Sequence, residues 1–511
     1  MNEYIGVRTL SNQVDKKGSA QLNNVKPRLE QTQKLLINGH WQYSSDQQSS
    51  EVIDPSTGKV ISKASVATYD DVNLAVSSAR ESFERGDWRK MTPSQRGKIL
   101  WKAADLLEEY GDEVATLEML DAGKQFSSAR HGEIPFAADC FRYFAGWCTK
   151  VEGTTKTLSI IPGQDFHAYT QREPIGVAAL IVPWNGPLVQ AVWKIAPALA
   201  AGCSCIIKPA METPLSTVRL AEIMIEAGVP AGVFNVILGG GSTAGKWLTE
   251  HLDVDKVSFT GSTGVGKQII EAAKGNLKKV SLELGGKSAM VVFPDADIEE
   301  ASQGAVDAIF SHAGQVCVAA SRLFIHQDVF DVMIEKIKAK TLAIKVGSCH
   351  DESTGMGPVI SQRQFDSICR YINIGIEEGG KLLTGGVPKD SNDGYYISPT
   401  IFVDVNPEMT IVKEEIFGPV LVVQSFNDND DITKMANNSE YGLAASIWTK
   451  NISKAHKAAA AMQAGLVWVN CHSIPDMAVP FGGYKQSGWG RENGYEALLQ
   501  YTELKSVIVK L

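Results

Sequence analysis

The hydrophobic and polar positions of the chain follow two different rhythms. Between about residues 70 and 110, apolar residues recur every three or four positions, as one face of an amphipathic helix requires. One stripe comprises Val72, Ala75, Val76, Ala79 and Phe83, and a second comprises Ile99, Leu100, Ala103, Leu106 and Leu107. Asp70 or Asp71 is expected to cap the first helix. Both stripes predict helices that face a core and carry no chemistry of their own.

From Ile175 the rhythm changes to short apolar runs. Ile175–Val182 is apolar throughout, as a strand buried on both faces would be. Further strands are predicted at 203–208, 233–238, 256–259 and 279–282, with helices at 188–200, 216–227, 243–251 and 265–273. This alternation predicts right-handed βαβ crossovers and a parallel sheet, in which ligands bind beyond the carboxyl ends of the strands.

A second α/β stretch begins at 288–293 and continues with a helix from about Asp297. Its alternation runs through 420–426 to 466–469, and 506–511 is predicted to be a final strand. A terminal strand needs a pairing partner, and another subunit is a plausible one. Residues 1–34 are polar and show no periodicity, which predicts a loosely packed extension.

Composition narrows the class of protein. The 511 residues, 44% hydrophobic and 21% charged, are typical of a large globular protein. The net charge of −9 without a basic block argues against nucleic-acid and anionic-membrane partners, and no apolar run is long enough to span a membrane. Eight scattered cysteines, no zinc-ligand spacing and no secretory signal predict a cytoplasmic protein without a metal site.

Two strand ends carry polar residues of ambiguous role. The loop 260–268 (TGSTGVGKQ) opens a helix with glycines, so phosphate binding and a tight turn are equal alternatives. A P-loop would need Ser or Thr where Gln268 stands. In the turn 183–187 (PWNGP), the Asn185 amide can stabilise an oxyanion or form an ordinary Asx turn. Lys208 ends the next strand, where it can bind ribose or phosphate.

Two further residues suit catalysis. Glu283 lies inside an apolar strand, and a buried carboxylate needs either a raised pKa, which suits a general base, or a structural ion pair. Cys317 follows Gly314 in a loop after an amphipathic helix. Most cysteines are inert core residues, but a thiolate at such a position is a strong nucleophile toward a carbonyl.

Together these segments resemble the NAD(P)-dependent aldehyde dehydrogenases, of the broad class 1/2-like kind, over Leu35 to Leu511. The matching motifs, in chain order, are 183–185 (PWN), 208–209 (KP), 259–263 (FTGST) with Gly266, 282–286 (LELGG), 314–317 (GQVC), 414–419 (EEIFGP) and 480–484 (PFGGY). Seven motifs at family-like separations make chance similarity very improbable.

The resemblance implies a role for each residue. Cys317 would form a thiohemiacetal, Asn185 and the Cys317 backbone N–H would hold its oxyanion, and Glu283 would activate the water that hydrolyses the thioester. Gly261, Ser262 and Gly266 would approach the pyrophosphate, Lys208 the adenosine ribose and Glu415 the nicotinamide ribose. The residues implied in cofactor binding are Trp184, Lys208, Gly241, Gly261, Ser262, Gly266, Leu284, Glu415 and Phe417.

The same alignment implies a substrate tunnel and leaves the cofactor preference open. The implied lining residues are Gly186, Val189, Gln190, Trp193, Val316, Val318, Ile474 and Phe481. Gly186 replaces an aromatic residue common in the family, which should widen the entrance. The absence of Arg and Lys favours an uncharged, apolar or aromatic aldehyde, and 468–470 (WVN) resembles phenylacetaldehyde dehydrogenases. Met211 stands where many NAD-preferring members have Glu, so NAD is expected and NADP stays open.

The family also implies the architecture. We expect an α/β protein with two Rossmann-like parallel-sheet domains and a small β oligomerisation element. The expected parts are an N-terminal extension (1–34), a cofactor domain (35–151 and 173–282), a catalytic domain (283–485) and the oligomerisation element (152–172 and 495–511). A hairpin in that element would pair with the C-terminal strand across a subunit boundary in a homodimer or homotetramer.

One residue-level observation argues against each of three alternative functions. A CoA-acylating relative typically lacks the base that Glu283 supplies. A catalytically silent structural protein on the same fold would be favoured by loss of Cys317 or Glu283, and both are present. A nucleotide hydrolase would need a hydroxyl at position 268.

Overall fold

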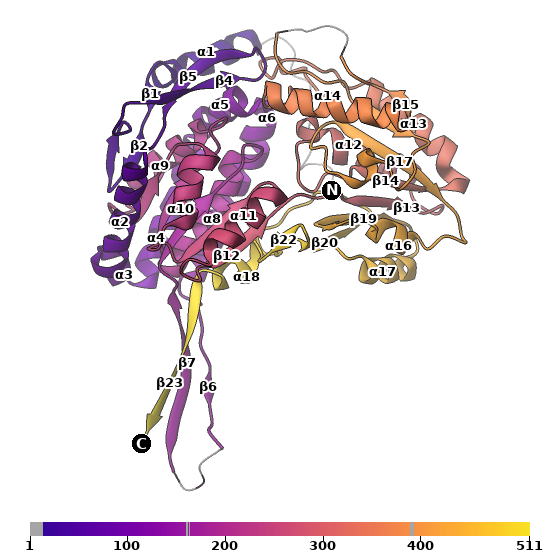
Figure 1. The fold of residues 1–511 in the computed structure, drawn as a ribbon. Coiled ribbons are helices and arrows are strands. Elements are labelled where there is room, and N and C mark those ends of the chain that lie inside the picture. The colour runs from indigo at the N-terminus through magenta and orange to yellow at the C-terminus, as the bar shows by residue number, and fades with distance from the viewer. Residues whose placement is uncertain (1–13, 160–161, 163, 389–392) are drawn as a thin grey trace.

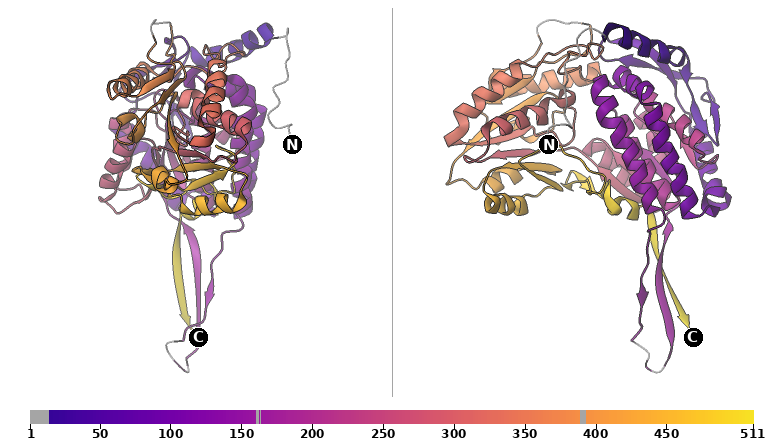
Figure 2. Two further views of the ribbon diagram at one scale, coloured as in Figure 1. Left: turned by 90° about the vertical axis from the view of Figure 1, so that its right-hand side faces the viewer. Right: turned by 180° about the vertical axis from the view of Figure 1, so that it is seen from behind.

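The computed structural model describes residues 14–159, 162, 164–388 and 393–511. Two α/β bodies lie side by side, and a narrow arm of β-strands projects away from them in each view (Figures 1 and 2). Each body has its own hydrophobic core around its own sheet. The alternation of apolar runs predicted an α/β protein with a parallel sheet, and the family resemblance implied two sheet-based bodies; both are confirmed.

The first body is built on an eight-stranded sheet in the order β22-β12-β11-β8-β9-β10-β2-β3. Its parallel strands are β8 (Val177–Ile181), β9 (Ser204–Lys208), β10 (Phe234–Val236), β11 (Lys256–Thr260) and β12 (Lys279–Glu283). Antiparallel strands β2 (Leu35–Ile37), β3 (His40–Gln42) and β22 (Gly488–Trp489) complete its edges. The first parallel strand, β8, lies between β9 and β11, so the chain reverses direction across the sheet there and opens a crevice at the strand ends.

Helices cover this sheet and follow the predicted stripes. They are α2 (Tyr69–Arg85), α3 (Asp87–Lys90), α4 (Pro93–Glu109), α5 (Gly111–Ala122), α6 (Phe126–Ser128), the turn η1 (Ala129–Glu133), α7 (Ile134–Trp147), α8 (Pro187–Ala201), α9 (Leu215–Ala227), the turn η2 (Gly241–Gly245), α10 (Lys246–Glu250), α11 (Thr263–Ala273) and α18 (Gly494–Leu499). The expected cap of α2 is wrong, because Thr68 holds that position. Its hydroxyl accepts from the Asp71 N–H (3.2 Å) while the Asp71 carboxylate accepts from the Thr68 N–H (2.9 Å), so the two form a capping box.

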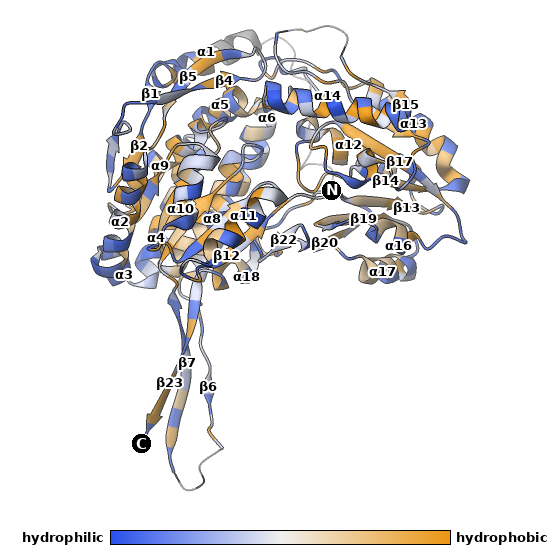
Figure 3. Ribbon diagram, in the orientation of Figure 1, coloured by the Kyte–Doolittle hydropathy of each residue, from blue (hydrophilic) through white to orange (hydrophobic). Residues whose placement is uncertain are grey.

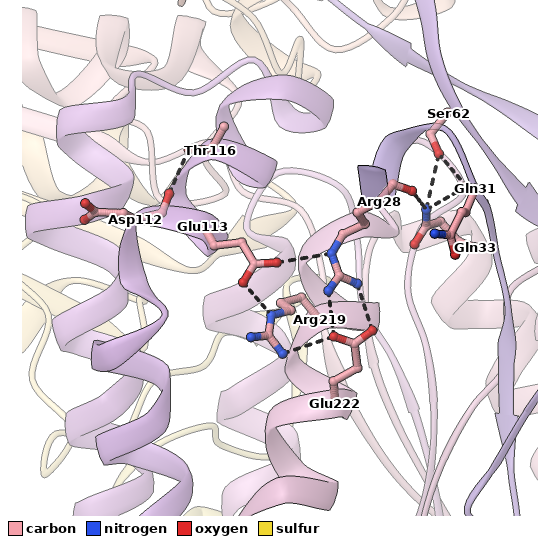
Figure 4. Close-up of polar contacts among 9 residues, drawn as sticks. All are labelled: Arg28, Gln31, Gln33, Ser62, Asp112, Glu113, Thr116, Arg219 and Glu222. Atoms are coloured by element: carbon pink, nitrogen blue, oxygen red, sulfur yellow. Dashed lines mark hydrogen bonds and ion pairs between the residues drawn. The ribbon is translucent and has the colours of Figure 1, made fainter. Parts of the chain in front are cut away.

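The N-terminal extension is not loosely packed in its described part. Helix α1 (Val14–Leu29) lies against the first body, with Val25 fully buried. Arg28 binds both carboxylate oxygens of Glu222 on α9 (2.8 and 2.7 Å) and Glu113 on α5 (3.2 Å). Arg219 bonds the same two glutamates, so the four side chains form a closed ring (Figure 4). The prediction failed because these partners lie far along the chain, where local periodicity carries no signal.

The second body contains a seven-stranded sheet in the order β15-β16-β17-β14-β13-β19-β20. The strands are β13 (Ala289–Val292), β14 (Arg322–His326), β15 (Lys381–Thr384), β16 (Thr400–Val403), β17 (Val420–Phe426), β19 (Ala444–Trp448) and β20 (Leu466–Val469). All pairs are parallel except β15 with β16. The accompanying helices are α12 (Ile298–Phe310), capped by Asp297, with the turns η3 (Ser311–Gly314) and η4 (Gln327–Val329), α13 (Phe330–Leu342), α14 (Gln362–Glu377), α15 (Thr410–Lys413), α16 (Ile432–Asn437) and α17 (Ile452–Ala461).

Two small sheets lie outside these bodies' main layers. One joins β1 (Thr32–Gln33), β5 (Lys59–Ser65) and β4 (Ser49–Asp54), and the other joins β18 (Tyr441–Gly442) and β21 (Tyr484–Lys485). No helix among the described residues is long and apolar enough to cross a bilayer. The same residues contain no group of three or more His, Cys, Asp or Glu side chains placed to hold a metal ion.

The arm is a three-stranded antiparallel sheet of β6 (Thr155–Lys156), β7 (Phe166–Pro174) and β23 (Thr502–Lys510). Strand β23 pairs with β7 along its full length, so the predicted pairing across a subunit boundary is wrong. Both strands leave the first body at one place, where the Ile175 N–H donates to the Tyr501 carbonyl (3.0 Å), and they can therefore pair within one chain. Apolar residues of β23 stay exposed, among them Leu504 and Ile508. Figure 3 shows the hydrophobic colouring of this strand toward its C-terminal end.

Candidate active site

The predicted functional residues of the first body gather at one edge of its sheet. Asn185 follows β8, Lys208 ends β9, Gly241 follows β10, Gly261 follows β11 and Glu283 ends β12. Because the carboxyl ends of parallel strands share one edge, residues nearly 100 positions apart in sequence come together there. This edge faces the second body, which supplies Cys317.

One cavity of about 310 Å³ brings the three candidate catalytic residues together: Asn185, Glu283 and Cys317 all line it. The structure also places there every residue aligned to the substrate tunnel: Gly186, Val189, Gln190, Trp193, Val316, Val318, Ile474 and Phe481. Sequence reasoning missed other lining residues, including Phe136, His312, Asp476 and Asn493. Only pairing across the fold reveals them, since each belongs to a segment without a motif of its own.

Cys317 reaches the cavity from a constrained turn after α12. His312 and Ala313 adopt left-handed backbone conformations (φ 48° and 53°), and Gly314 follows at φ 72°, close against the Gly418 carbonyl. Burial raises the pKa of the Cys317 thiol to about 12, with Glu415 and Glu283 adding to the rise. The backbone N–H groups of Val318 and Cys317 act in the opposite direction. The resting thiol is therefore protonated at neutral pH.

Glu283 is almost completely enclosed. Among the described residues, neither oxygen of its carboxyl group has a hydrogen-bond partner. Burial raises its pKa well above the ordinary range, and Glu492 raises it further, whereas Lys194 and Arg491 lower it. When ionised, such a carboxylate is a strong base, which suits proton abstraction.

A buried ion pair lies at the wall of the cavity: Glu492 lines the cavity, whereas its partner Lys194 does not. Lys194, on the apolar helix α8, donates to Glu492 (2.5 Å) and to the Thr260 hydroxyl (2.8 Å). The Ser258 hydroxyl also donates to Glu492 (3.2 Å). Sequence reasoning missed this pair, although a lysine within so apolar a helix was an available signal.

The Asn185 side chain is held at both ends. Its Nδ2 donates to the backbone carbonyl of Gln315 (2.9 Å), and its Oδ1 accepts from Gln190 Nε2 (3.2 Å). A primary amide carries two hydrogens, so one hydrogen of Nδ2 is left for a ligand. A Cβ at Gly186 would lie 3.0 Å from Gln190 Nε2, so the space predicted to widen the entrance holds the Gln190 amide.

A larger groove of about 860 Å³ runs between the η2–α10 segment and α11. Of the residues aligned to cofactor binding, Lys208 and Gly241 line it, together with Phe259, Val265 and Gln268. Lys208 Nζ donates to the carbonyls of Pro209 (2.8 Å) and Gly239 (3.0 Å), and burial lowers its pKa to about 8.

The glycines after β11 serve close packing. A Cβ at Gly266 would lie 2.7 Å from the Leu284 side chain, and one at Gly261 would lie 2.5 Å from the Phe259 ring. Ser262 caps α11 by accepting from the Val265 N–H (3.4 Å). These contacts support a packing role for the glycines, and they leave the N-terminus of α11, which favours anions, beside the groove.

The second body closes the site from the other side. Glu415 accepts from the Gly286 N–H (2.9 Å), which lies just after β12. Burial raises the pKa of Glu415 to about 7, while this N–H and Lys287 lower it. The Phe417 ring packs edge-on against Trp184 with centroids 5.3 Å apart, so two residues aligned to cofactor binding meet across the two bodies.

These features fit an extended dinucleotide. The groove, with a volume of about 860 Å³, has room for a nucleotide half beside a helix N-terminus and a buried lysine. The Glu415 carboxylate, a hydrogen-bond acceptor when ionised, lies near the cavity that holds Cys317, since it raises the pKa of that thiol. Phe259, which lines the groove, and Thr260, which lines the cavity, are consecutive residues of β11, so the two spaces lie at the same strand end.

Comparison with known proteins identifies the family to which the chain belongs. The aldehyde dehydrogenase family model matches residues 41–507. The chain is 48% identical to aldehyde dehydrogenase 1 of Tanacetum cinerariifolium over 475 residues, 93% of this chain and 94% of that protein. It is 44% identical to phenylacetaldehyde dehydrogenase of Pseudomonas fluorescens, over 93% and 95% of the two chains. The NAD+ complex of aldehyde dehydrogenase from Bacillus cereus superposes with a TM-score of 0.93 at 42% identity, covering 98% and 99%. The chain belongs to the aldehyde dehydrogenase family and is an NAD(P)-dependent enzyme.

Proposed function

We propose that this enzyme oxidises an uncharged apolar or aromatic aldehyde to its carboxylic acid through a thioester on Cys317. The observation that carries the proposal is the convergence of Cys317, Glu283 and Asn185 on one mostly apolar cavity. A thiol, a strong base and a fixed amide donor are the groups that acyl transfer through a nucleophile needs.

The residues act in sequence. The Cys317 thiol gives its proton to solvent, and its sulfur bonds to the aldehyde carbon, while the Asn185 amide and the Cys317 N–H hold the resulting oxyanion. NAD(P)+, when bound beside the thiol, would supply the hydride acceptor, and loss of the hydride from that carbon leaves a thioester. Glu283 then takes a proton from water, whose oxygen bonds to the acyl carbon. The C–S bond breaks, the carboxylic acid leaves, and Glu283 returns its proton to the thiolate.

The walls of the cavity support the substrate class. Three aromatic side chains follow one another along it: Phe136 and Trp193 have ring centroids 6.1 Å apart, and Trp193 and Phe481 have theirs 5.2 Å apart. No lysine or arginine is among the described lining residues, whereas Glu133 and Asp476 are. An anionic aldehyde would therefore meet no countercharge, and an aryl ring would meet ring faces and edges. That one relative oxidises phenylacetaldehyde agrees with this class.

NAD is the proposed preferred cofactor. Met211 packs half-buried against the core and presents no carboxylate to a ribose, while Glu212 is exposed one position later and its charge acts on Lys208. A carboxylate at this end of the groove disfavours a 2′-phosphate. The contrast between initial rates with NAD and NADP tests this preference.

The division into domains and the assembly are proposals as well. We assign the cofactor domain to 35–151 and 173–282, the catalytic domain to 283–485 and the oligomerisation element to 152–172 and 495–511. The exposed apolar residues on the projecting arm support assembly into a homodimer or homotetramer. All eight cysteines are free thiols, which supports a reducing, cytoplasmic location.

Absorbance at 340 nm tests the activity, with a panel of aliphatic, aromatic and anionic aldehydes and either cofactor. We expect wild type to reduce cofactor fastest with aromatic aldehydes and Cys317→Ala to reduce none. Cys369→Ala, at a cysteine on α14 outside the cavity, is the matched control and should keep wild-type rates. A folded wild type that binds NAD but oxidises no aldehyde would favour the alternative, a catalytically silent structural protein.

A further inference from the structure

We propose that Gln190 is a positioning residue of the oxyanion site, because it fixes the orientation of the Asn185 amide through a hydrogen-bond relay that starts at the Gln315 backbone. This inference rests on the proposed function, since Asn185 must stabilise an oxyanion for its orientation to matter. Gln190 acts through the Asn185 amide, to which its side chain donates a hydrogen bond.

The relay has a defined direction. A backbone carbonyl can only accept, so the Gln315 carbonyl requires the Nδ2 end of Asn185 to face it, at 2.9 Å. The Oδ1 end of Asn185 then faces Gln190, and only the Nε2 end of Gln190 can donate to it, at 3.2 Å. Each amide therefore has one permitted orientation, and turning either one over would set two donors or two acceptors against each other.

The start of the relay is itself rigid. Gln315 is fully buried, its Oε1 accepts from the Ile360 N–H (2.9 Å) and its Nε2 donates to the His312 carbonyl (3.2 Å). These bonds tie the Gln315 main chain to the turn that delivers Cys317 two residues later. The Asn185 amide is thus held in position by the same segment that carries the nucleophile.

The other end of the relay shows what the orientation costs. Gln190 Oε1 is buried and finds no partner among the described residues. A buried acceptor without a hydrogen bond is unfavourable, so the side chain keeps its Nε2 on Asn185 while its own oxygen goes unpaired. Gly186 permits this arrangement, because the Cβ of any larger residue would lie 3.0 Å from Gln190 Nε2.

The relay predicts non-additive kinetics. Gln190→Met keeps the length and apolar contacts of the side chain but removes the donor, so the Asn185 amide can rotate away from the oxyanion. We expect kcat/KM for phenylacetaldehyde to fall roughly 5- to 30-fold, a fraction of the 10²- to 10³-fold loss typical for removal of a whole oxyanion donor, as in Asn185→Ala. In the Asn185→Ala background, Gln190→Met should change kcat/KM less than twofold.

Controls separate this role from a general effect on cavity shape. Val189→Ala alters the same cavity from the neighbouring position without a hydrogen bond to Asn185, so its effect should multiply with that of Asn185→Ala. Cofactor affinity and the thermal midpoint should be unchanged in Gln190→Met. If that variant does not fold, Gln190→Leu carries the same comparison.

Hydrolysis of 4-nitrophenyl acetate distinguishes failure of the relay from failure of the proposed function. Ester hydrolysis needs the thiol and the oxyanion site but no hydride acceptor, so Gln190→Met should slow it to the same degree. A wild type that hydrolyses the ester but oxidises no aldehyde overturns the proposed function alone. Wild-type rates in Gln190→Met, or losses that multiply with those of Asn185→Ala, overturn the relay.

Discussion

Two ionic clusters of this protein use the same chemistry in opposite surroundings. Lys194 and Glu492 meet beside the candidate active site with side chains only 1% and 6% exposed. The ring of Arg28, Glu113, Arg219 and Glu222 joins α1 to the first body with exposures between 9% and 32%. The ring has more ion pairs than the buried site. We nevertheless expect the single buried pair to contribute more to the stability of the fold.

The difference lies in solvation. Water screens partly exposed pairs, so they contribute little, whereas a buried charge that loses its partner has no water to replace it. The Lys194–Glu492 pair also stands beside Glu283, a buried carboxyl group without a partner of its own. Counting ion pairs therefore misjudges their importance, and burial of each member is the better guide.

The largest expected effect comes from breaking the buried pair. Glu492→Ala leaves Lys194 charged and enclosed, which should lower the free energy of unfolding by about 3–5 kcal/mol. Urea denaturation followed by intrinsic fluorescence measures the change. Replacing both members, as in Lys194→Met with Glu492→Leu, should restore most of it, and a double variant as unstable as Glu492→Ala would show that burial of the charge is not the cause.

Removing the unpaired carboxyl group should act in the opposite direction. Glu283→Gln should slow turnover by about 10²–10⁴-fold, because the proposed general base is lost, and at pH 8 should raise the free energy of unfolding by about 1–3 kcal/mol. A raised folded-state pKa stabilises below the unfolded value and loses that contribution as pH rises. The advantage of Glu283→Gln over wild type should therefore grow from pH 5 to pH 9 in thermal melts, and a constant difference would contradict the assignment.

Glu415 lies between the paired Glu492 and the unpaired Glu283, because its buried carboxyl group accepts one hydrogen bond, from a backbone N–H. With its pKa at about 7, its proposed hydrogen bond from a ribose hydroxyl is strongest above that pH, where the carboxylate is ionised. We expect the Kd for NAD to rise up to tenfold for each pH unit below 7, as titration of a single group requires. Isothermal titration calorimetry measures this, and Glu415→Gln should bind weakly with no such dependence. Wild-type affinity that stays flat from pH 8 to pH 5.5 would count against Glu415.

The smallest effect belongs to the exposed ring. Arg28→Ala removes two of its ion pairs but should lower the free energy of unfolding by only about 0.2–1 kcal/mol. The loss should shrink further in 1 M salt, where screening is stronger. A loss as large as that of Glu492→Ala would overturn the comparison, because it would show that the docking of α1 depends on these charges.

Sequence alone could predict features whose cause is local or repeats along the chain. The strands that end at Lys208 and Glu283, and the strand that precedes Asn185, were predictable because apolar runs bounded by polar residues define them, and a parallel sheet brings their ends to one edge. The Lys194–Glu492 pair and the pairing of β23 with β7 were not predictable in the same way. Each joins segments roughly 300 or more residues apart, and no local pattern records such contacts.

The pairing of β22, near the end of the chain, with β12, near its middle, also has a consequence for synthesis of the protein. Strand β12 is complete at Glu283, but its outer neighbour β22 begins only at Gly488. At about 5–20 residues per second, a ribosome needs roughly 10 to 40 s to make the intervening segment. Throughout that time the growing chain carries an open sheet edge, a target for chaperones and for misassembly. A nascent chain that stops before residue 488 leaves this edge unfilled, so premature termination even near the end should yield an aggregation-prone product.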